Sequence, residues 1–253
     1  MNSLFLNPLN IHPDWKPFLS KGILDLITQI EFEITKKEFT PSAEKVLRFF
    51  ELPLQSTKII ILGQDPYPQA GIATGRAFEV GTLKSWNEPF RNISLKNILR
   101  TLYKAYSGNT INYNLLKEKF DNEFPVLAPD KLFKHWESQG VLLLNTSFTC
   151  EPGISGSHKK LWEDFSSKLL EYINSKNELF TWFLWGNHAL EATSNMSLKN
   201  KIVSQHPMMC YKKEGKETDF LYGEVNCFER LINEIDWTGF KLTGNLSPPT
   251  TLF

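Results

Sequence analysis

Four apolar runs of this 253-residue chain each end in a polar residue or turn that could do chemistry. A carboxylate, an amide, a tight polar turn and an imidazole lie at the ends of the runs at 58–63, 141–145, 179–186 and 201–207: Asp65, Asn145, Gly186-Asn187 and His206. Carboxylate and imidazole serve proton transfer and charge stabilisation, and an amide offers a donor and an acceptor together. The four ends predict a polar site if the fold brings them to one edge.

Each residue also has an ordinary structural interpretation. Asp65 precedes a proline and is typical of a turn, and a lone histidine such as His206 is more often structural. Asn145 ends an apolar run, where an unpartnered amide costs about 1–3 kcal/mol, so it either caps a loop or binds a ligand. Phe78 on its own reads as a core residue. The convergence of the four ends, more than any one residue, favours a site.

The elements between these residues alternate. The apolar runs are short, as in strands buried on both faces, and helical patterns separate them. These patterns predict βαβ units, a parallel sheet and a ligand crevice at the carboxyl ends of its strands. We expect helices after Thr40-Pro41, after caps at Ser94 and Asp130, after the third strand, and over 157–176 and 226–235.

Composition narrows the class of protein. Lysine and arginine number 28 and aspartate and glutamate 28, so the net charge is zero, which argues against broad electrostatic coating of nucleic acid but not against a local groove. Three widely spaced cysteines indicate a reducing compartment. No window reaches the roughly 18 apolar residues of a membrane span and the start lacks a basic leader, so we expect an intracellular protein that binds no membrane.

Several common chemistries lack their sequence signals. No two of the five histidines have HxH or HxxxH spacing, and GxSxG, GxxxxGK[ST] and GxGxxG are all missing. Metal sites, acyl transfer, nucleotide hydrolysis and dinucleotide binding therefore have little support. We expect neither a metal nor a cofactor.

The motifs GQDPYPQAGIATGRAFEV, QGVLLLNTSFTCEPGISGSHKKLWEDF, FLWGNHA and SQHPMMCY, in this order, resemble those of the family 1 uracil-DNA glycosylases. The resemblance covers about residues 55–235. It implies an α/β fold: a single-domain α/β/α sandwich over 1–253 with a central four-stranded parallel sheet. It also implies a hydrolase of base excision repair that flips uracil out of DNA and cleaves its N-glycosidic bond, leaving an abasic site without metal or cofactor.

The same resemblance assigns the chemistry residue by residue. Asp65 matches the carboxylate that orients water and stabilises positive charge on the sugar. His206 matches the donor to uracil O2 as negative charge develops on the leaving base. Asn145 matches the amide that reads the Watson–Crick edge.

The remaining pocket residues also match the family. Phe78 matches the ring that stacks on the flipped base, Tyr67 the ring that excludes a 5-methyl group, and Gln64 a contributor of backbone to the pocket. The glycines and prolines around them would keep this pocket rigid.

Contacts with DNA are expected from short loops that offer N–H groups and hydroxyls. The resemblance places them in the Pro89–Ser94 loop, at Gly156-Ser157-His158, at Gly186-Asn187, and at Pro207, Met208 and Met209. The expected partner is uracil-containing DNA, single- or double-stranded, and the expected state is a monomer. The sequence leaves open a proteinaceous inhibitor or a replication partner, and a cytoplasmic or, in a eukaryote or a nuclear-replicating virus, a nuclear location.

Departures from the family pattern leave alternatives open. Pro68 follows Tyr67 where the family has histidine, only Pro89 remains of a proline run, Asn187 stands for serine, and Met208-Met209 replace a region with a leucine that wedges into the duplex. The methionines either serve as the wedge or pack against the protein. A glycosylase for a different or modified pyrimidine, and a non-catalytic DNA-binding scaffold, remain alternative functions.

Overall fold

The computed structural model describes residues 3–213, 215 and 217–242. The chain divides into two compact units. The first consists of the described residues up to Thr82, with Gly140–Leu184 and His188–Lys201. The second consists of Leu83–Gln139, Trp185–Asn187 and the described residues from Ile202 onward. A single domain over 1–253 stays a prediction.

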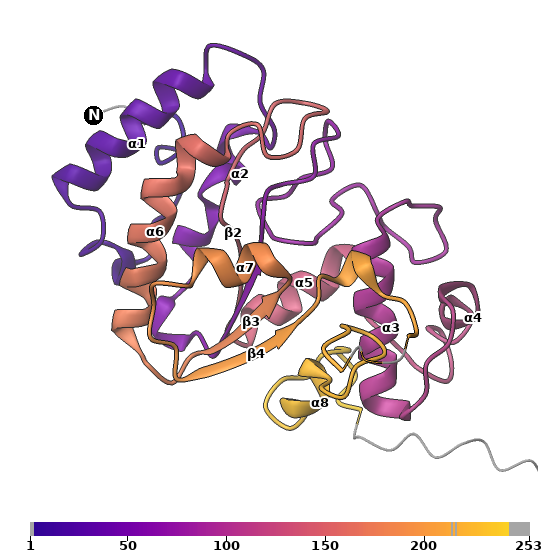
Figure 1. Ribbon diagram of the computed structural model, residues 1–253. Coiled ribbons are helices and arrows are strands. Elements are labelled where there is room, and N and C mark those ends of the chain that lie inside the picture. The colour runs from indigo at the N-terminus through magenta and orange to yellow at the C-terminus, as the bar shows by residue number, and fades with distance from the viewer. Residues whose placement is uncertain (1–2, 214, 216, 243–253) are drawn as a thin grey trace, which may run out of the picture. The chain divides into compact units, whose positions relative to one another are not determined.

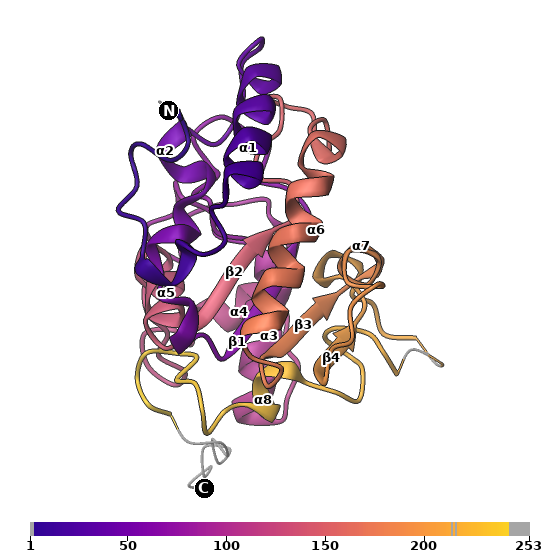
Figure 2. The same ribbon diagram turned by 90° about the vertical axis from the view of Figure 1, so that its left-hand side faces the viewer.

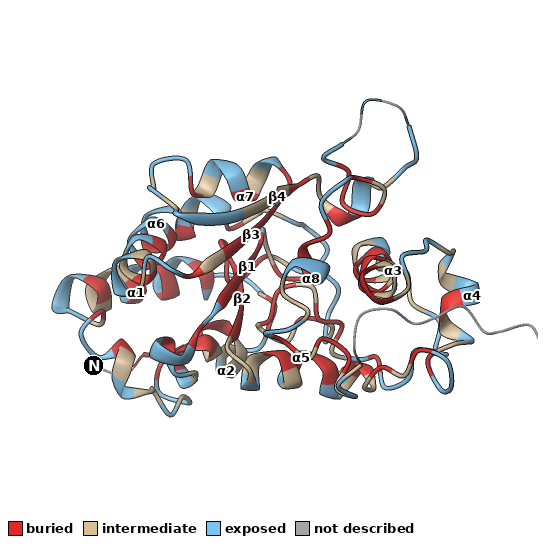
Figure 3. Ribbon diagram, turned by 90° about the horizontal axis from the view of Figure 1, so that it is seen from below, coloured by how far each residue is buried: buried red, intermediate tan, exposed pale blue. Residues whose placement is uncertain are grey.

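A four-stranded parallel sheet confirms the predicted α/β fold class. Its strands, in the order β2-β1-β3-β4, are β1 (Ile59–Gly63), β2 (Val141–Asn145), β3 (Thr181–Trp185) and β4 (Asn200–Ser204). Every residue of β1 and β2 is buried, as the red ribbon of both strands shows (Figure 3). Burial on both faces explains why these strands read as unbroken apolar runs rather than as alternating patterns.

The register of β1 fixes the edge where the polar residues emerge. Gly63, the last residue of β1, is paired with Asn145, the last residue of β2. Beyond the strands the backbone ladder continues, with Thr146 N–H donating to Gly63 O at 3.1 Å and Ser147 N–H to Gln64 O at 2.8 Å. The two chain segments therefore leave the sheet side by side.

The first unit holds the long helices α1 (Lys21–Ile34) and α6 (Lys159–Lys176), which lie side by side (Figures 1 and 2). It also holds α2 (Ala43–Val46), the 3-10 turns η1 (Pro13–Trp15), η2 (Arg48–Glu51) and η3 (Leu54–Ser56), and α7 (Asn187–Ala192) from its second residue on. Helix α1 was not predicted, although its isoleucines follow helical spacing.

The helix predicted after Thr40-Pro41 is interrupted. It is split between α2 and η2. The rings of Phe49 and Phe50 both pack on Trp15, at 5.4 and 5.2 Å between centroids. Both rings are buried by this tertiary contact, which the local sequence pattern does not show.

The second unit holds α3 (Ile93–Ser107), α4 (Tyr113–Lys117), α5 (Pro129–Ser138), η4 (Pro207–Met209) and α8 (Cys227–Arg230). Three predicted boundaries were wrong. Helix α3 begins before Ser94, with Asn92 at its N-cap, and α5 has Ala128 there, followed by proline at the first helical position. Helix α8 ends at Arg230, not near 235, because Leu231 leaves helical geometry.

Aromatic side chains dominate the cores. In the second unit, Phe228, Trp136 and Trp237 are almost fully buried, and the ring of Phe228 meets that of Trp237 edge to face at 4.9 Å. Across the residues that the structure describes, no helix is both long and apolar enough to cross a membrane.

Gly140, directly before β2, offers a test of this packing. Its φ is +94°, and a Cβ there would lie 2.3 Å from Ser56 O, whereas Gly71, with φ +77°, faces open space. In Gly71→Ala the only cost is that of holding alanine in a left-handed backbone conformation, about 1 kcal/mol. We expect Gly140→Ala to lower the free energy of unfolding, measured in urea, by at least about 1 kcal/mol more than Gly71→Ala does, because the backbone at Ser56 must also move. Equal losses in the two variants would contradict this packing.

Candidate functional site

In the first unit the site begins where β1 and β2 end. Asn145 is buried, and an ideal Cβ on Gly63 would lie 2.3 Å from its Oδ1, so only glycine leaves room for this amide. Among the described residues no hydrogen bond holds the Asn145 side chain. The amide is therefore positioned by packing while its donor and acceptor are available.

The Asp65 carboxylate is held by the loop before α6. Its Oδ2 accepts a hydrogen bond from Ser155 Oγ at 2.5 Å and another from Gly156 N–H at 3.0 Å. Oδ1 makes no hydrogen bond to the described residues, and the side chain is only half-buried. One oxygen thus orients the carboxylate and the other is open to water.

The backbone just before Asp65 is fixed as firmly. Gln64 O accepts from Ser147 N–H at 2.8 Å and from Thr146 Oγ1 at 3.1 Å. His188 Nε2 lies 2.5 Å from the same Thr146 hydroxyl. Burial, with the positive charge of Lys159, holds the pKa of His188 below its usual value, so the ring is neutral at pH 7. A neutral ring protonated on Nε2 donates to Thr146 Oγ1, which in turn donates to Gln64 O.

Thr146 and His188 also line a cavity of about 240 Å³ beside α6 and α7. Its charged residues have both signs: Lys159, Glu163 and Glu191. Asp65, Asn145 and Phe78 are not among its lining residues. This cavity is therefore distinct from the predicted base-binding residues.

Phe78 has an unusual backbone. Its φ is +66°, which is a rare conformation for a bulky residue. A buried ion pair between Arg76 Nη1 and Glu79 Oε2, at 2.8 Å, spans the position. Strain of this kind persists only where the surroundings impose it, and it is concentrated at functional sites.

The loop bearing Tyr67 is tied to the chain after β2. Pro68 O accepts from Gly153 N–H at 2.8 Å, and the Cys150 thiol lies 3.6 Å from Pro66 O. Tyr67 itself is half-buried. The predicted stiffness of this loop thus comes from two prolines and from contacts with residues 150–153.

The Ser157-His158 pair is engaged inside its own loop. Ser157 Oγ accepts from Glu151 N–H at 2.7 Å, and Thr149 Oγ1 accepts from Trp162 Nε1 and lies 2.9 Å from His158 Nδ1. His158 is buried, and burial lowers the pKa of its imidazole. DNA contact by these two residues stays a prediction.

The cysteine thiols and the potential metal-binding side chains limit the kinds of reaction that the described residues can support. Burial, with the negative charge of Asp65, raises the pKa of Cys150 to about 12, and burial raises that of Cys210 to about 12 and that of Cys227 further. All three thiols stay protonated and are poor nucleophiles. Within the described residues there is no group of three histidine, cysteine, aspartate or glutamate side chains that could hold a metal ion.

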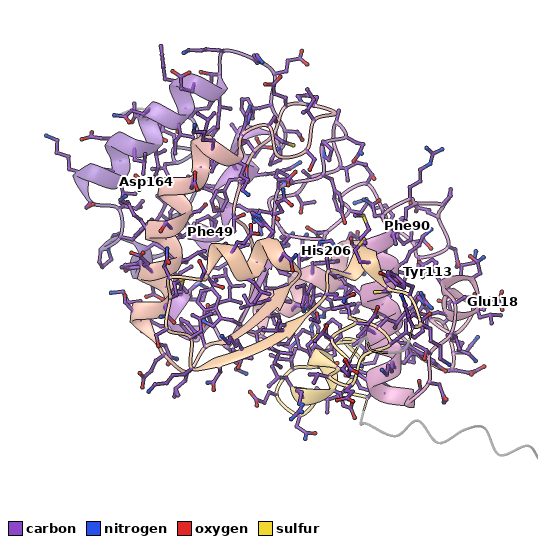
Figure 4. All side chains as sticks on the ribbon, in the orientation of Figure 1. Phe49, Phe90, Tyr113, Glu118, Asp164 and His206 are labelled. Carbon is purple, nitrogen blue, oxygen red and sulfur yellow. The ribbon has the colours of Figure 1, made fainter. Side chains whose placement is uncertain are left out.

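In the second unit His206 lies between β4 and η4 (Figure 4). Its Nδ1 accepts a hydrogen bond from Met208 N–H at 3.2 Å, so a neutral ring carries its proton on Nε2. Gly186, with φ +90°, lies beneath it, and a Cβ there would come within 2.8 Å of His206 Cβ. Glycine at 186 therefore allows the imidazole to approach the turn after β3.

The loop beyond His206 presents apolar side chains to solvent. Pro207 is buried, whereas Met208 and Met209 are 55% and 51% exposed, so neither methionine fills a gap in the core. Met209 N–H donates to His206 O at 2.8 Å. Pro89 and Asn187 are exposed and Ser94 is half-buried in the first turn of α3.

Several residues that build the site escaped the sequence analysis. Ser155 carried a usable signal, since a serine followed by glycine shortly before a helix is typical of a tight turn. Thr146 and His188 carried none, because their contact joins two distant segments. Asn97, whose Nδ2 donates to Pro207 O at 2.7 Å, carried none either.

Comparison with known proteins shows the family of this chain. The model of the uracil DNA glycosylase superfamily matches residues 49–230. Uracil-DNA glycosylase 1 of Listeria monocytogenes is 31% identical over 234 residues, covering 88% of this chain and 96% of its own. Uracil-DNA glycosylase of Corynebacterium glutamicum is 31% identical over 242 residues, covering 92% and 94%.

Solved structures show the same fold. Mimivirus uracil-DNA glycosylase aligns with a TM-score of 0.65 at 24% identity, covering 88% of this chain and 82% of its own. A mimivirus UNG variant in complex with UGI aligns with a TM-score of 0.61 at 26% identity, covering 78% and 70%. With its family model spanning most of the sequence and curated relatives matched nearly end to end, the chain belongs to the uracil DNA glycosylase superfamily.

Proposed function

We propose that this protein is a monofunctional uracil-DNA glycosylase, which flips uracil out of DNA and hydrolyses the bond between uracil N1 and sugar C1′. The observation that carries the proposal is the Asp65 carboxylate, fixed through one oxygen by Ser155 and Gly156 and open at the other. The names of its relatives support uracil as the base. The product is an abasic site, the substrate of later repair steps.

The first unit supplies water activation and base recognition. Asp65 Oδ1 accepts a hydrogen bond from the attacking water, and its negative charge stabilises the positive charge that develops on the sugar. The Asn145 amide donates to uracil O4 and accepts from N3–H, so that one side chain reads both. Phe78 stacks on the base, and Tyr67 closes the side where thymine carries its methyl group.

His206 is the group proposed to receive the leaving base. When the N1–C1′ bond breaks, its electron pair stays with uracil and negative charge gathers on O2. His206 donates from Nε2 to this oxygen, because Met208 N–H occupies Nδ1. A single donor of this kind is worth roughly 100- to 1,000-fold in rate.

The proposed partner is uracil-containing DNA, single- or double-stranded. Met209 on η4 is the candidate wedge, since its apolar side chain is half exposed and its backbone is anchored to His206 O. Because a mimivirus relative binds UGI, we include this inhibitor among the candidate partners of the chain.

The direct test is alkaline strand cleavage of oligonucleotides that carry one uracil, in single strands and in U:G and U:A pairs. Release of uracil from all three supports the proposal. Cleavage only at another modified pyrimidine, or DNA binding without any cleavage, would favour one of the two alternative functions.

Asp65→Asn should reduce turnover by at least about 100-fold, because the water loses its charged acceptor, while affinity for uracil-containing DNA stays near that of the parent. Single-turnover cleavage and fluorescence anisotropy measure the two quantities. Asp164→Asn is the matched control, since this carboxylate lies on the exposed face of α6 (Figure 4). A turnover within a few-fold of the parent would remove Asp65 from the chemistry.

Asn145→Asp should reduce uracil release and allow release of cytosine, because a carboxylate accepts from the exocyclic amine of cytosine and cannot donate to uracil O4. The measurement is alkaline strand cleavage of two matched oligonucleotides, one that carries a single uracil and one that has cytosine in its place. Unchanged uracil release together with no cytosine release would place Asn145 outside the base pocket.

Met209→Ala should depress cleavage at U:A much more than cleavage of a single strand, because a wedge compensates for lost stacking only in a duplex. Met208→Ala, a neighbour of equal exposure, is the matched control. The readout is the ratio of the cleavage rate at U:A to the cleavage rate in the single strand. A ratio equal to that of the parent would show that Met209 is not the wedge.

A further inference from the structure

Asn97, on α3 in the second unit, is a buried amide that no motif singles out. Its Nδ2 donates to Pro207 O at 2.7 Å, and its Oδ1 accepts from Arg100 Nη1 at 2.8 Å. Both ends of the amide are therefore engaged, one by a neighbour on the same helix and one by the residue that follows His206. Buried amides satisfied in this way specify a local geometry.

Arg100 determines which end of the amide faces Pro207. A guanidinium only donates, so the Asn97 oxygen must face Arg100 and the NH₂ group must face Pro207. Arg100 cannot easily turn away, because its Nε donates to Ile111 O at 2.6 Å and its Nη2 to Tyr222 OH at 2.9 Å. The rigid fork of the guanidinium thus fixes the orientation of Asn97.

The contact at Pro207 reaches His206 through one peptide unit. The carbonyl of Pro207 and the N–H of Met208 belong to the same planar group and point in opposite directions. Asn97 Nδ2 donates to the oxygen of this peptide group, and the Met208 N–H of the same group donates to His206 Nδ1 at 3.2 Å. The Cys210 thiol lies 3.1 Å from the same oxygen. The direction of the Met208 N–H is therefore set from α3.

We infer that Asn97 and Arg100 are positioning residues for His206. A line of hydrogen bonds runs from the Arg100 guanidinium through the Asn97 amide and the Pro207–Met208 peptide to His206 Nδ1. It holds the imidazole in the orientation and tautomer that present Nε2–H to the leaving base. The inference rests on the proposed function for the role of His206, whereas the line of contacts stands on the geometry alone.

Asn97→Asp tests the central contact. A carboxylate has the shape of the amide and keeps the bond with Arg100, but it cannot donate to Pro207 O. We expect kcat on a single-stranded uracil oligonucleotide to fall about tenfold or more, which is part of the rate that the His206 donor would contribute in full. We expect KM to stay within about twofold of the parent. A single strand is used because it removes the contribution of the wedge.

Arg100 is tested by a graded pair. Arg100→Met leaves the Asn97 amide free to turn over, and we expect kcat to fall, whereas Arg100→Lys keeps one donor and should restore most of it. Lys104→Met is the matched control, because Lys104 lies one turn further along α3 and donates to Leu221 O and Gly223 O, without touching Asn97 or Pro207. We expect it to lower Tm without lowering kcat.

The tautomer of His206 is read without any substrate. In ¹⁵N-histidine-labelled protein the parent should show an unprotonated Nδ1 and a protonated Nε2 for His206, assigned by its loss in His206→Ala. Asn97→Asp and Arg100→Met should shift this signature toward a mixture of tautomers. A parental signature and parental kcat in both variants would overturn the inference, and so would an equal loss of kcat in Lys104→Met.

A double variant separates this inference from the proposed function. If Asn97 acts through His206, Asn97→Asp should cost nothing further in kcat once His206→Ala is present. If Asn97→Asp lowers kcat as much in the His206→Ala background as in the parent, its effect is independent of His206, and the inference is overturned. No uracil release by the parent protein would refute the proposed function instead, and the tautomer measurement would still decide the role of Asn97 and Arg100.

Discussion

The pairing of β1 with β2 is the constraint on which the first unit depends. Its register sets Gly63 against Asn145, and the ladder runs on through two more backbone hydrogen bonds beyond the last strand residues. Asp65 and Asn145 are thereby delivered by adjacent, rigid segments. A shift of the register by one residue would turn every side chain to the other face, so the buried strands also determine which side chains the edge presents.

Precision at this edge comes from hydrogen bonds rather than from a surplus of charge. The chain has no net charge, and the carboxylate of Asp65 is oriented by a hydroxyl and a backbone N–H. In the second unit a single guanidinium works at a distance, through an amide and a peptide group, on His206. Neutral dipoles fixed in advance cost little reorganisation when charge develops in a reaction. This is compatible with recognition of DNA through loops rather than through a basic surface.

The sequence predicted what depends on local pattern. The buried strands and the polar residues at their ends could be read from short apolar runs, and the motifs assigned roles to Asp65, Asn145 and His206. It could not predict what depends on tertiary contact. The helix after Pro41 is interrupted where two neighbouring phenylalanines both pack on one distant tryptophan, and Ser155 and Asn97 acquire their roles only when distant segments meet.

The exposure of Met208 and Met209 has a consequence for the sulfur chemistry of the protein. The three thiols are held protonated by burial and resist oxidation, whereas the thioethers of these two methionines are open to solvent. Peroxide would convert them to sulfoxides, which are polar and are reversed by methionine sulfoxide reductases. Oxidative damage would then fall on the loop proposed to enter the duplex and spare the base pocket, so that repair of paired uracil would fade before repair in single strands.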